Sequence, residues 1–296
     1  MDGDLKILIT GGSGFIGRNL AESLAFHYDI VAPSSAELNL MDSSAVRSYL
    51  CTHRFDVVVH AATTRSNRRM AAPADLLDRN CRMFFSLARN AGLFGKMISF
   101  GSGAEYDRRH LPPRVKEDYF DTSVPADAYG FSKYICAKYI ERSDNIVNLR
   151  LFGVFGKYED YTVRFISNAC CRALKGLPII IRQDVVFDYL YIEDLTRITS
   201  WFIEHEPCYK AYNVVRGEGV ALTELARIVA DVSGQNPQVL VRQPGLAPEY
   251  SADNGLMRKE IGDYRFREFS QSIRELYSWY ATNQERIDAD SLRFDE

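Results

Sequence analysis

The sequence predicts an α/β protein built on a doubly wound parallel sheet, and three features carry this prediction. The first half alternates between short apolar runs and amphipathic segments, and a glycine-rich turn joins the first run to the first such segment. The rhythm of this alternation changes after Gly156. We therefore expect a large first unit and a smaller mixed α/β lobe. The first unit is expected to comprise residues 1–156 with about 183–206, and the lobe 157–182 with 207–296.

The glycine-rich turn lies between an apolar strand at residues 7–10 and a helix with one apolar face. Gly11, Gly14 and Gly17 are spaced three apart. In this context the glycines allow a tight turn, close approach of a pyrophosphate to the backbone, and close packing of helix on sheet. A glycine triplet alone is weak evidence, and a purely structural turn is the alternative. With the strand before it and the helix after it, the turn predicts a dinucleotide site of Rossmann type.

A second strand is expected at residues 29–32, and the residues at its carboxyl end bear on the choice of cofactor. In this fold an acidic residue there binds the ribose hydroxyls of NAD, and a basic residue suits the phosphate of NADP. This chain has neither at that end, and Ser34, Ser35 and Arg18 are candidates to hold the phosphate. We therefore expect NADP(H), with NAD(H) as the alternative. Asp42 is a candidate to cap the next helix or to accept a hydrogen bond from the adenine amino group.

The next apolar runs, at residues 55–60 and 97–100, predict further strands buried on both faces of a parallel sheet. The first of them delivers His60, Ala61 and Ala62 to the carboxyl edge, where ligands bind in such sheets. Small residues there allow a cofactor to lie against the backbone. We expect His60 to be a packed residue at the strand end and not a catalyst.

The second half of the chain predicts shorter elements in a less regular order. Residues 188–194 lead a helix with an apolar face, which we expect to pack back on the first unit. The tail after Gln284 is polar, and we expect it to be frayed. The other expected elements are strands at 145–151, 179–181, 212–215 and 239–241, and helices at about 163–174, 223–232 and 269–280.

Tyr129 and Lys133 are separated by one helical turn, so their side chains leave the same face of a helix expected at residues 129–142. A phenol has a pKa of about 10, and lowering it by about three units requires roughly 4 kcal/mol of differential stabilisation of the phenolate. The ammonium of Lys133 and an oxidised nicotinamide ring are suitable perturbing charges. Such a pair occurs in many helices by chance, but here a dinucleotide site precedes it and Ser102 ends an intervening strand. We expect Tyr129 to act as an acid or base near neutral pH.

Several motifs along nearly the whole chain belong together. They are residues 10–17, His60-Ala61-Ala62, Ser102 four residues before Tyr106, residues 129–133, 149–156, 188–194 and 212–214. Jointly they resemble the extended short-chain dehydrogenase/reductases, which are nucleotide-sugar epimerases, dehydratases and reductases. The resemblance implies that Ser102 holds a sugar oxygen, Tyr129 exchanges its proton, and Lys133 binds the nicotinamide ribose and tunes Tyr129. It also implies that the second lobe binds the nucleotide diphosphate of the substrate, and that a homodimer forms through the helices containing Phe84 and Tyr129.

Departures from the family pattern narrow the expected reaction. Dehydratases of the family carry a Thr-Asp-Glu run, and the matching residues here are Ser102, Gly103 and Ala104, so dehydration is not expected. Residues 38–43 are similar to the GDP-fucose synthase branch, which epimerises with a Cys and a His. Those positions fall at Ala104 and near Arg164, so this acid–base pair is absent. Epimerases of the UDP-galactose type need only the tyrosine, but they have an acidic residue after the second strand.

The reaction that remains is the NADPH-dependent reduction of the 4-keto group of a nucleotide-activated deoxy sugar. Tyr129 protonates the developing alkoxide and Ser102 stabilises it. The alternatives are an NAD-dependent 4-epimerase and a non-catalytic regulator that senses a dinucleotide. The residues expected to bind the cofactor are Gly11, Ser13, Gly14, Phe15, Ile16, Arg18, Ser34, Asp42, His60, Ala61, Ala62, Tyr129 and Lys133. Ser102, Gly103, Arg164, Arg182 and Arg216 are expected to bind the substrate, although each arginine has a plain surface position as its alternative.

The composition argues against several other classes of protein. Hydrophobic residues make up 46% and charged residues 25%, which is ordinary for a globular protein, and a net charge of −3 gives no reason to expect nucleic acid or an anionic membrane as partner. No apolar run reaches membrane-spanning length, and no secretory signal is visible. The six cysteines form neither a CxxC pair nor a disulfide framework, so we expect free thiols, no metal site and a cytoplasmic location.

Overall fold

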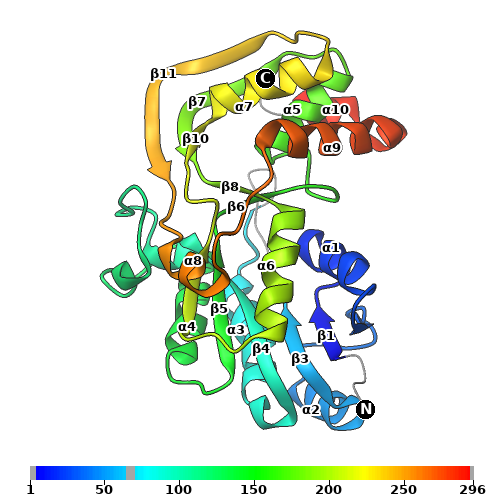
Figure 1. The fold of residues 1–296 in the computed structure, drawn as a ribbon, viewed down its shortest axis with the longest axis vertical. Helices are drawn as coiled ribbons and strands as arrows, with labels where there is room; N and C mark the ends of the chain where they lie inside the picture. Colours follow the sequence, from blue (N-terminus) through cyan, green and yellow to red (C-terminus); the bar gives the residue numbers. More distant parts are fainter. Residues whose placement is uncertain (1–4, 65–70, 294–296) are drawn as a thin grey trace.

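The computed structural model describes residues 5–64 and 71–293. Its central sheet has six parallel strands in the order β2-β1-β3-β4-β5-β9 (Figure 1). The chain passes from β1 outward to β2 and then to β3 on the other side of β1, which confirms the doubly wound sheet that the sequence predicts. These strands are β1 (Lys6–Thr10), β2 (Asp29–Val31), β3 (Phe55–His60), β4 (Phe94–Ser102), β5 (Ile146–Leu151) and β9 (Ala211–Val214).

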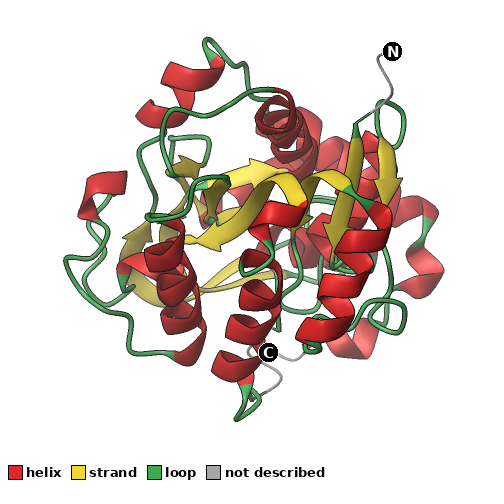
Figure 2. Ribbon diagram, turned by 90° about the horizontal axis from the view of Figure 1, so that it is seen from below, coloured by secondary structure: helices red, strands yellow, loops and turns green. Residues whose placement is uncertain are grey.

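Helices cover both faces of the central sheet (Figure 2). Successive side chains of each strand point to opposite faces, so the apolar side chains on both faces need helices to bury them. Ile7 and Ile9 belong to a hydrophobic cluster with α1 (Phe15–Leu24) and α6 (Ile192–Glu204). Leu8, between them, belongs to a second cluster on the opposite face. The helices of that second cluster are α2 (Ser43–His53), α3 (Leu76–Ala88) and α4 (Ala128–Ile140).

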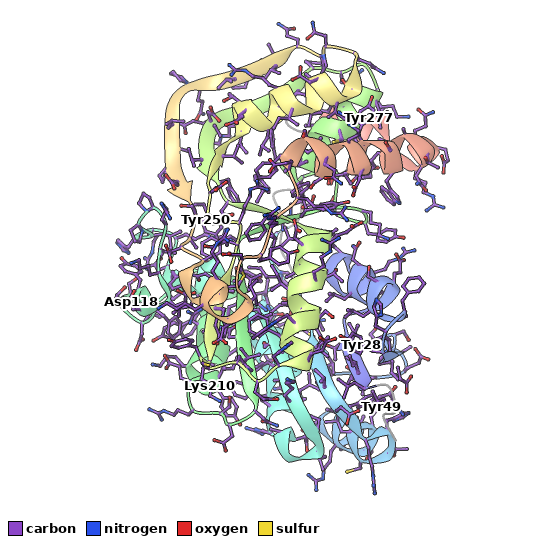
Figure 3. All side chains as sticks on the ribbon, viewed as in Figure 1. Tyr28, Tyr49, Asp118, Lys210, Tyr250 and Tyr277 are labelled. Carbon is purple, nitrogen blue, oxygen red and sulfur yellow. The ribbon has the colours of Figure 1, made fainter. Side chains whose placement is uncertain are left out.

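The helix after residues 188–194 packs back on the first unit, as the sequence predicts. α6 runs beside α1 in Figure 1, and both contribute to one core. The Tyr28 hydroxyl donates a hydrogen bond of 2.5 Å to the Glu204 carboxylate and lies 2.7 Å from the Ser200 hydroxyl. Tyr28 follows α1, so these bonds connect the two helices at their ends (Figure 3).

The upper part of Figure 1 holds a smaller, mixed sheet of three strands in the order β10-β7-β11. β7 (Ile179–Phe187) pairs parallel with β11 (Val239–Tyr250) and antiparallel with β10 (Val220–Ala221). Both β7 and β11 are longer than expected, because they continue to pair through an irregularity between Gln243 and Leu246. Most of β11 is exposed, so its extension lacks the apolar pattern that marks a buried strand.

Helices α5, α7, α9 and α10 pack around this smaller sheet, and two short parallel strands, β6 and β8, pair below it (Figure 1). The remaining elements are α5 (Phe165–Leu174), α7 (Leu222–Ser233), α8 (Gly255–Ile261), α9 (Phe269–Thr282), α10 (Ala289–Leu292), β6 (Gly153–Phe155), β8 (Tyr189–Tyr191) and the 3₁₀ helices η1 (Ala91–Leu93), η2 (Gly103–Tyr106), η3 (Glu117–Tyr119) and η4 (Gln284–Arg286).

Two parts of the structure differ from the expected partition and from the expected tail. β9 lies within residues 207–296, which we assigned to the smaller lobe, but it pairs with β5 at the edge of the central sheet. Residues 183–187, which we assigned to the first unit, belong to β7 of the smaller sheet. The tail is not wholly frayed, because Ile287 and Leu292 are buried in the core. Two apolar side chains in a polar segment are enough to dock it.

Three further observations concern the classes of protein considered from the sequence. In the part of the chain that the structure describes, no helix is both long enough and apolar enough to cross a membrane. All six cysteines are free thiols. Within residues 5–64 and 71–293, His, Cys, Asp and Glu side chains form no group of three or more that could hold a metal ion.

Candidate active site

The glycine-rich turn packs directly against the carboxyl end of β3. Gly11 has a φ of +74°, and a Cβ atom on it would lie 2.7 Å from the amide nitrogen of Ala62. Gly17 lies against the turn, since its Cβ would be 2.3 Å from the carbonyl oxygen of Gly11. The amide of Ala61 donates to the Thr10 carbonyl at 3.2 Å. The turn and residues 61–62 therefore form one edge lined by backbone, which suits the close approach of a dinucleotide.

The amino end of α1 offers backbone donors to an anion. Gly14 is its N-cap and supplies no side-chain hydrogen bond to the first turn. The first amides of a helix lack partners within the helix, so they are free to bind a phosphate. Ser13 is exposed beside them, whereas Phe15 is buried and Ile16 half-buried. Phe15 therefore has only its backbone to offer a cofactor.

Two of the residues expected to bind an NADP phosphate, Arg18 and Ser34, already have partners. Arg18 forms an ion pair of 3.0 Å with Glu22, and its guanidinium lies 3.8 Å from the centre of the Tyr158 ring. The amide of Ser34 donates to the Glu37 carboxylate at 2.8 Å. An acidic group, the Glu37 carboxylate, therefore does lie near the end of β2, although the residues directly after the strand include no acid. Glu37 is brought there by the turn that follows the strand.

Two other residues expected near the cofactor are held by local bonds. Asp42 caps α2 by accepting from the amides of Ser44 and Ala45, both at 3.0 Å, which is the simpler of its two predicted roles. His60 is buried at the end of β3, with its Nδ1 2.9 Å from the Thr10 hydroxyl. Burial, assisted by the charge of Lys133, lowers the pKa of His60 to about 3. His60 is thus a neutral, packed residue at neutral pH.

Ser102 stands at the carboxyl end of β4, in a turn held by a buried polar network. Its hydroxyl accepts from the amide of Ala104 at 3.2 Å, and its own amide donates to Oε1 of Glu105 at 3.0 Å. Oε2 of Glu105 accepts from Arg150 at 2.7 Å and from Asn148 at 3.0 Å. This network connects the Ser102 turn to β5, and the sequence reasoning missed it because its members are far apart along the chain.

Tyr129 and Lys133 lie on the first turns of α4, facing β4. Asp127 caps this helix by accepting from the amide of Gly130 at 2.8 Å. Nζ of Lys133 donates to the carbonyl of Phe100 at 2.7 Å and lies 6.0 Å from the centre of the Tyr129 ring. Phe100 precedes Ser102 by two residues on β4, so the fold brings the three predicted catalytic residues to one end of the strand.

Tyr250, which the sequence reasoning missed, reaches this site from the smaller sheet. It ends β11, where that strand approaches the central sheet (Figure 3). A Cβ atom on Gly103 would lie 2.5 Å from the Tyr250 hydroxyl and 2.6 Å from the Phe152 ring. Gly103, expected to contact substrate, is therefore buried under these two rings. Tyr250 presents a polar group there instead, and no local motif marks it.

Arg108 is the second residue that the sequence reasoning missed. It follows the buried Asp107, whose φ is +58°, and its guanidinium lies 5.1 Å from the centre of the Tyr250 ring. Arg108 is exposed to solvent. The pKa of Tyr250 is raised by burial, and the charge of Arg108 opposes this effect. Tyr129 and Ser102 also interact with Tyr250, so these four residues form one cluster.

The three arginines expected to bind a diphosphate occupy separate places. Arg164 is exposed at the start of α5, and Arg182 is exposed on β7. Arg216 is mostly buried, with its guanidinium 4.7 Å from the centre of the Phe269 ring. The three arginines thus belong to three different segments, and their binding of a diphosphate stays a prediction.

Comparisons with known proteins agree with this architecture. The sequence profile of the NAD dependent epimerase/dehydratase family matches residues 7–215. GDP-L-colitose synthase of Yersinia pseudotuberculosis is 23% identical over 293 residues, which cover 90% of this chain and 92% of that protein.

Two solved structures are similar over almost their whole length. One is a UDP-glucose 4-epimerase from Thermotoga maritima with UDP-glucose, at 20% identity and a TM-score of 0.81, covering 95% of this chain and 100% of the other. The second is a GDP-mannoheptose C4 reductase from Campylobacter jejuni with NADP bound, at 19% identity and a TM-score of 0.81, covering 95% and 99%. At these identities the two structures establish a shared fold, which hosts both reactions.

Proposed function

Since the chain belongs to the NAD dependent epimerase/dehydratase family, we propose that it uses NADPH to reduce the 4-keto group of a nucleotide-activated deoxy sugar. One observation carries this proposal. Nζ of Lys133, which lies beside Tyr129, donates a hydrogen bond to the carbonyl of Phe100 on β4, two residues before Ser102. The carboxylates of Glu105 and Asp127 lie near this group, but both are engaged in holding the turn and the helix. A simple ketone reduction needs neither of them as acid or base.

The residues present fit a bound dinucleotide. Gly11 leaves a cradle that a Cβ atom would fill, and the first amides of α1 are open to a pyrophosphate. When bound, NADPH supplies the hydride. In this proposal Tyr129 donates the proton to the ketone oxygen, and the Lys133 ammonium stabilises the phenolate left behind. Ser102 donates a hydrogen bond to the same oxygen as negative charge develops on it.

A second candidate is an NAD-dependent 4-epimerase, and one observation favours it. The Glu37 carboxylate lies at the Ser34 amide, beyond the end of β2, where negative charge repels the extra phosphate of NADP. Such an enzyme retains its dinucleotide and consumes no reductant. A cytoplasmic location and a homodimer through α3 and α4 remain predictions beside both candidates.

The first test identifies ligands and then measures turnover. Mass spectrometry of gently purified protein shows which dinucleotide and which nucleotide sugar it retains. NADPH oxidation is then followed with 4-keto-6-deoxy sugars in the GDP and dTDP series. We expect Tyr129→Phe to lower kcat by at least about 100-fold, because a general acid contributes about 10²–10⁴. The affinity for NADPH should persist.

Tyr139→Phe is the matched control, since Tyr139 lies on the same helix but is 38% exposed and packs on Phe85. It should turn over like the wild type. Unchanged turnover in Tyr129→Phe would refute the assigned chemistry. Interconversion of two nucleotide sugars without net NADPH consumption would identify the epimerase. Binding of NADPH without turnover of any nucleotide sugar would point to the regulator.

A further inference from the structure

We propose that the Tyr250 hydroxyl, assisted by Arg108, binds the sugar hydroxyl next to the reacting carbonyl and so selects 4-keto sugars that retain oxygen at C3. This inference rests on the proposed function, because it takes the keto group to lie at Ser102 and Tyr129. It adds a binding group from the smaller sheet to a site otherwise built from the central one.

The first support is an unsatisfied hydroxyl. Within the described residues, two buried side-chain oxygens make no hydrogen bond of normal geometry, those of Tyr250 and Tyr280. Arg108 and Ser102 lie close enough to the Tyr250 hydroxyl to lower its pKa as donors, but neither forms a well-aligned bond with it. Buried polar groups almost always have a partner, so each exception calls for an explanation. Tyr280 lies on α9 with its side chain in the core, away from the site, whereas Tyr250 lies among Ser102, Arg108 and Tyr129. A ligand in the site is therefore a ready partner for Tyr250 alone.

The second support is that the Tyr250 side chain is held in place before any ligand arrives. It is only 9% exposed, and its ring packs on Phe152 and Phe187, each at 4.8 Å between ring centres. Its carbonyl accepts from the amide of Asp188 at 3.0 Å, which anchors the end of β11. Gly103 leaves just enough room for the hydroxyl. A hydroxyl fixed in this way loses little entropy on binding, so it discriminates well between ligands.

The third support is the charge of Arg108. Its neighbour Arg109 is paired with Asp107 at 2.7 Å, but Arg108 forms no ion pair with a carboxylate in the described part of the chain. Asp127 attracts it only from a greater distance. The guanidinium instead faces the Tyr250 ring and remains open to solvent. A cation beside the phenol strengthens it as a hydrogen-bond donor and also attracts the electron-rich oxygens of a sugar.

The chemistry of the sugar ring points to C3. The Tyr250 hydroxyl lies against Gly103, the residue after Ser102, so the hydroxyls of Ser102 and Tyr250 are neighbours, as are the oxygens on adjacent carbons of a sugar ring. If Ser102 binds the oxygen at C4, the partner of Tyr250 is on a neighbouring carbon. In a pyranose C5 carries no hydroxyl, because its oxygen belongs to the ring. The hydroxyl at C3 remains.

The test compares two nucleotide-linked 4-keto-6-deoxyhexoses that differ only in the presence of the C3 hydroxyl, in the GDP and dTDP series. For the wild type we expect kcat/KM to be about 10- to 100-fold higher with the C3 hydroxyl, since an analogue lacking it leaves Tyr250 unpaired. Tyr250→Phe should lower kcat/KM for the 3-hydroxy substrate and leave that for the 3-deoxy substrate unchanged, which abolishes the preference. Arg108→Gln should reduce the preference without changing the affinity for NADPH.

Tyr280→Phe is the matched control, because it removes an equally buried and equally unpaired hydroxyl outside the site. It should keep the preference. The inference is overturned if the wild type uses both substrates equally, or if Tyr250→Phe lowers kcat/KM equally for both. In either case the wild type still reduces a 4-keto sugar, so the proposed reduction stands. If the wild type reduces neither substrate while it binds NADPH, the proposed function fails and the inference fails with it.

Discussion

Replacing Glu105 by Gln is expected to destabilise the protein by about 3–5 kcal/mol, because it leaves the buried charge of Arg150 without its counter-charge. Glu105 is 0% exposed and Arg150 2%, and their charged atoms are 2.7 Å apart. Three donors, from Ser102, Asn148 and Arg150, share the two carboxylate oxygens. A glutamine has one acceptor oxygen and adds an NH₂ group, so at least one of these donors loses its acceptor.

The assay is urea denaturation followed by circular dichroism, with the loss read from the midpoint at an unchanged slope. Asp78→Asn is the control, because it breaks an exposed pair of 2.8 Å with Arg82 and should leave the midpoint in place. A loss below about 1 kcal/mol for Glu105→Gln would refute the reasoning, since it would mean that the network repacks without the charge. The Ser102 turn should loosen as well, so the surviving folded variant should show a lower kcat.

Two further changes test the packing of the cofactor edge. On going from neutral pH to about pH 4.5, the wild type should lose about 3 kcal/mol of unfolding free energy that His60→Gln retains. The pKa of this histidine is about 6.5 in the unfolded chain and about 3 when buried, so over this range the unfolded chain binds a proton that the folded protein does not. Equal acid sensitivity of both proteins would contradict the burial of a neutral imidazole. Gly17→Ala should cost about 1–3 kcal/mol through its clash with Gly11, whereas Gly92→Ala, which meets open space, should be neutral in the same urea titration. Similar midpoints for the two alanine variants would show that the helix can shift away from the turn.

Much of the fold was predictable because it is encoded in consecutive residues. The run at 55–60 is apolar on both faces, which is the mark of an interior parallel strand, and β3 occupies these positions. The length of β11 was underestimated for the opposite reason, because an exposed edge strand carries no such apolar pattern. The residues of β9 predict a strand but do not indicate which sheet it joins. Only its pairing with β5 assigns it to the central sheet.

The candidate site divides in the same way. The spacing of Tyr129 and Lys133 predicts that they share a helix face, and the end of the β4 run predicts the place of Ser102. The partners of these residues come from elsewhere in the chain. Glu37 reaches Ser34 through a turn that the strand pattern does not describe, and Tyr250 arrives from a different sheet.

The sequence by itself determined the alternation of strands and helices, the glycine-rich turn, and the helix face that carries Tyr129 and Lys133. Each depends on the identity and spacing of residues within one or two elements, where backbone geometry sets which side chains meet. Only the tertiary structure decided that Arg150 neutralises Glu105 beneath Ser102, and that Tyr250 places an unpaired hydroxyl beside Arg108. Such contacts depend on how distant elements pack, and a choice among many possible packings leaves no periodic signal along the chain.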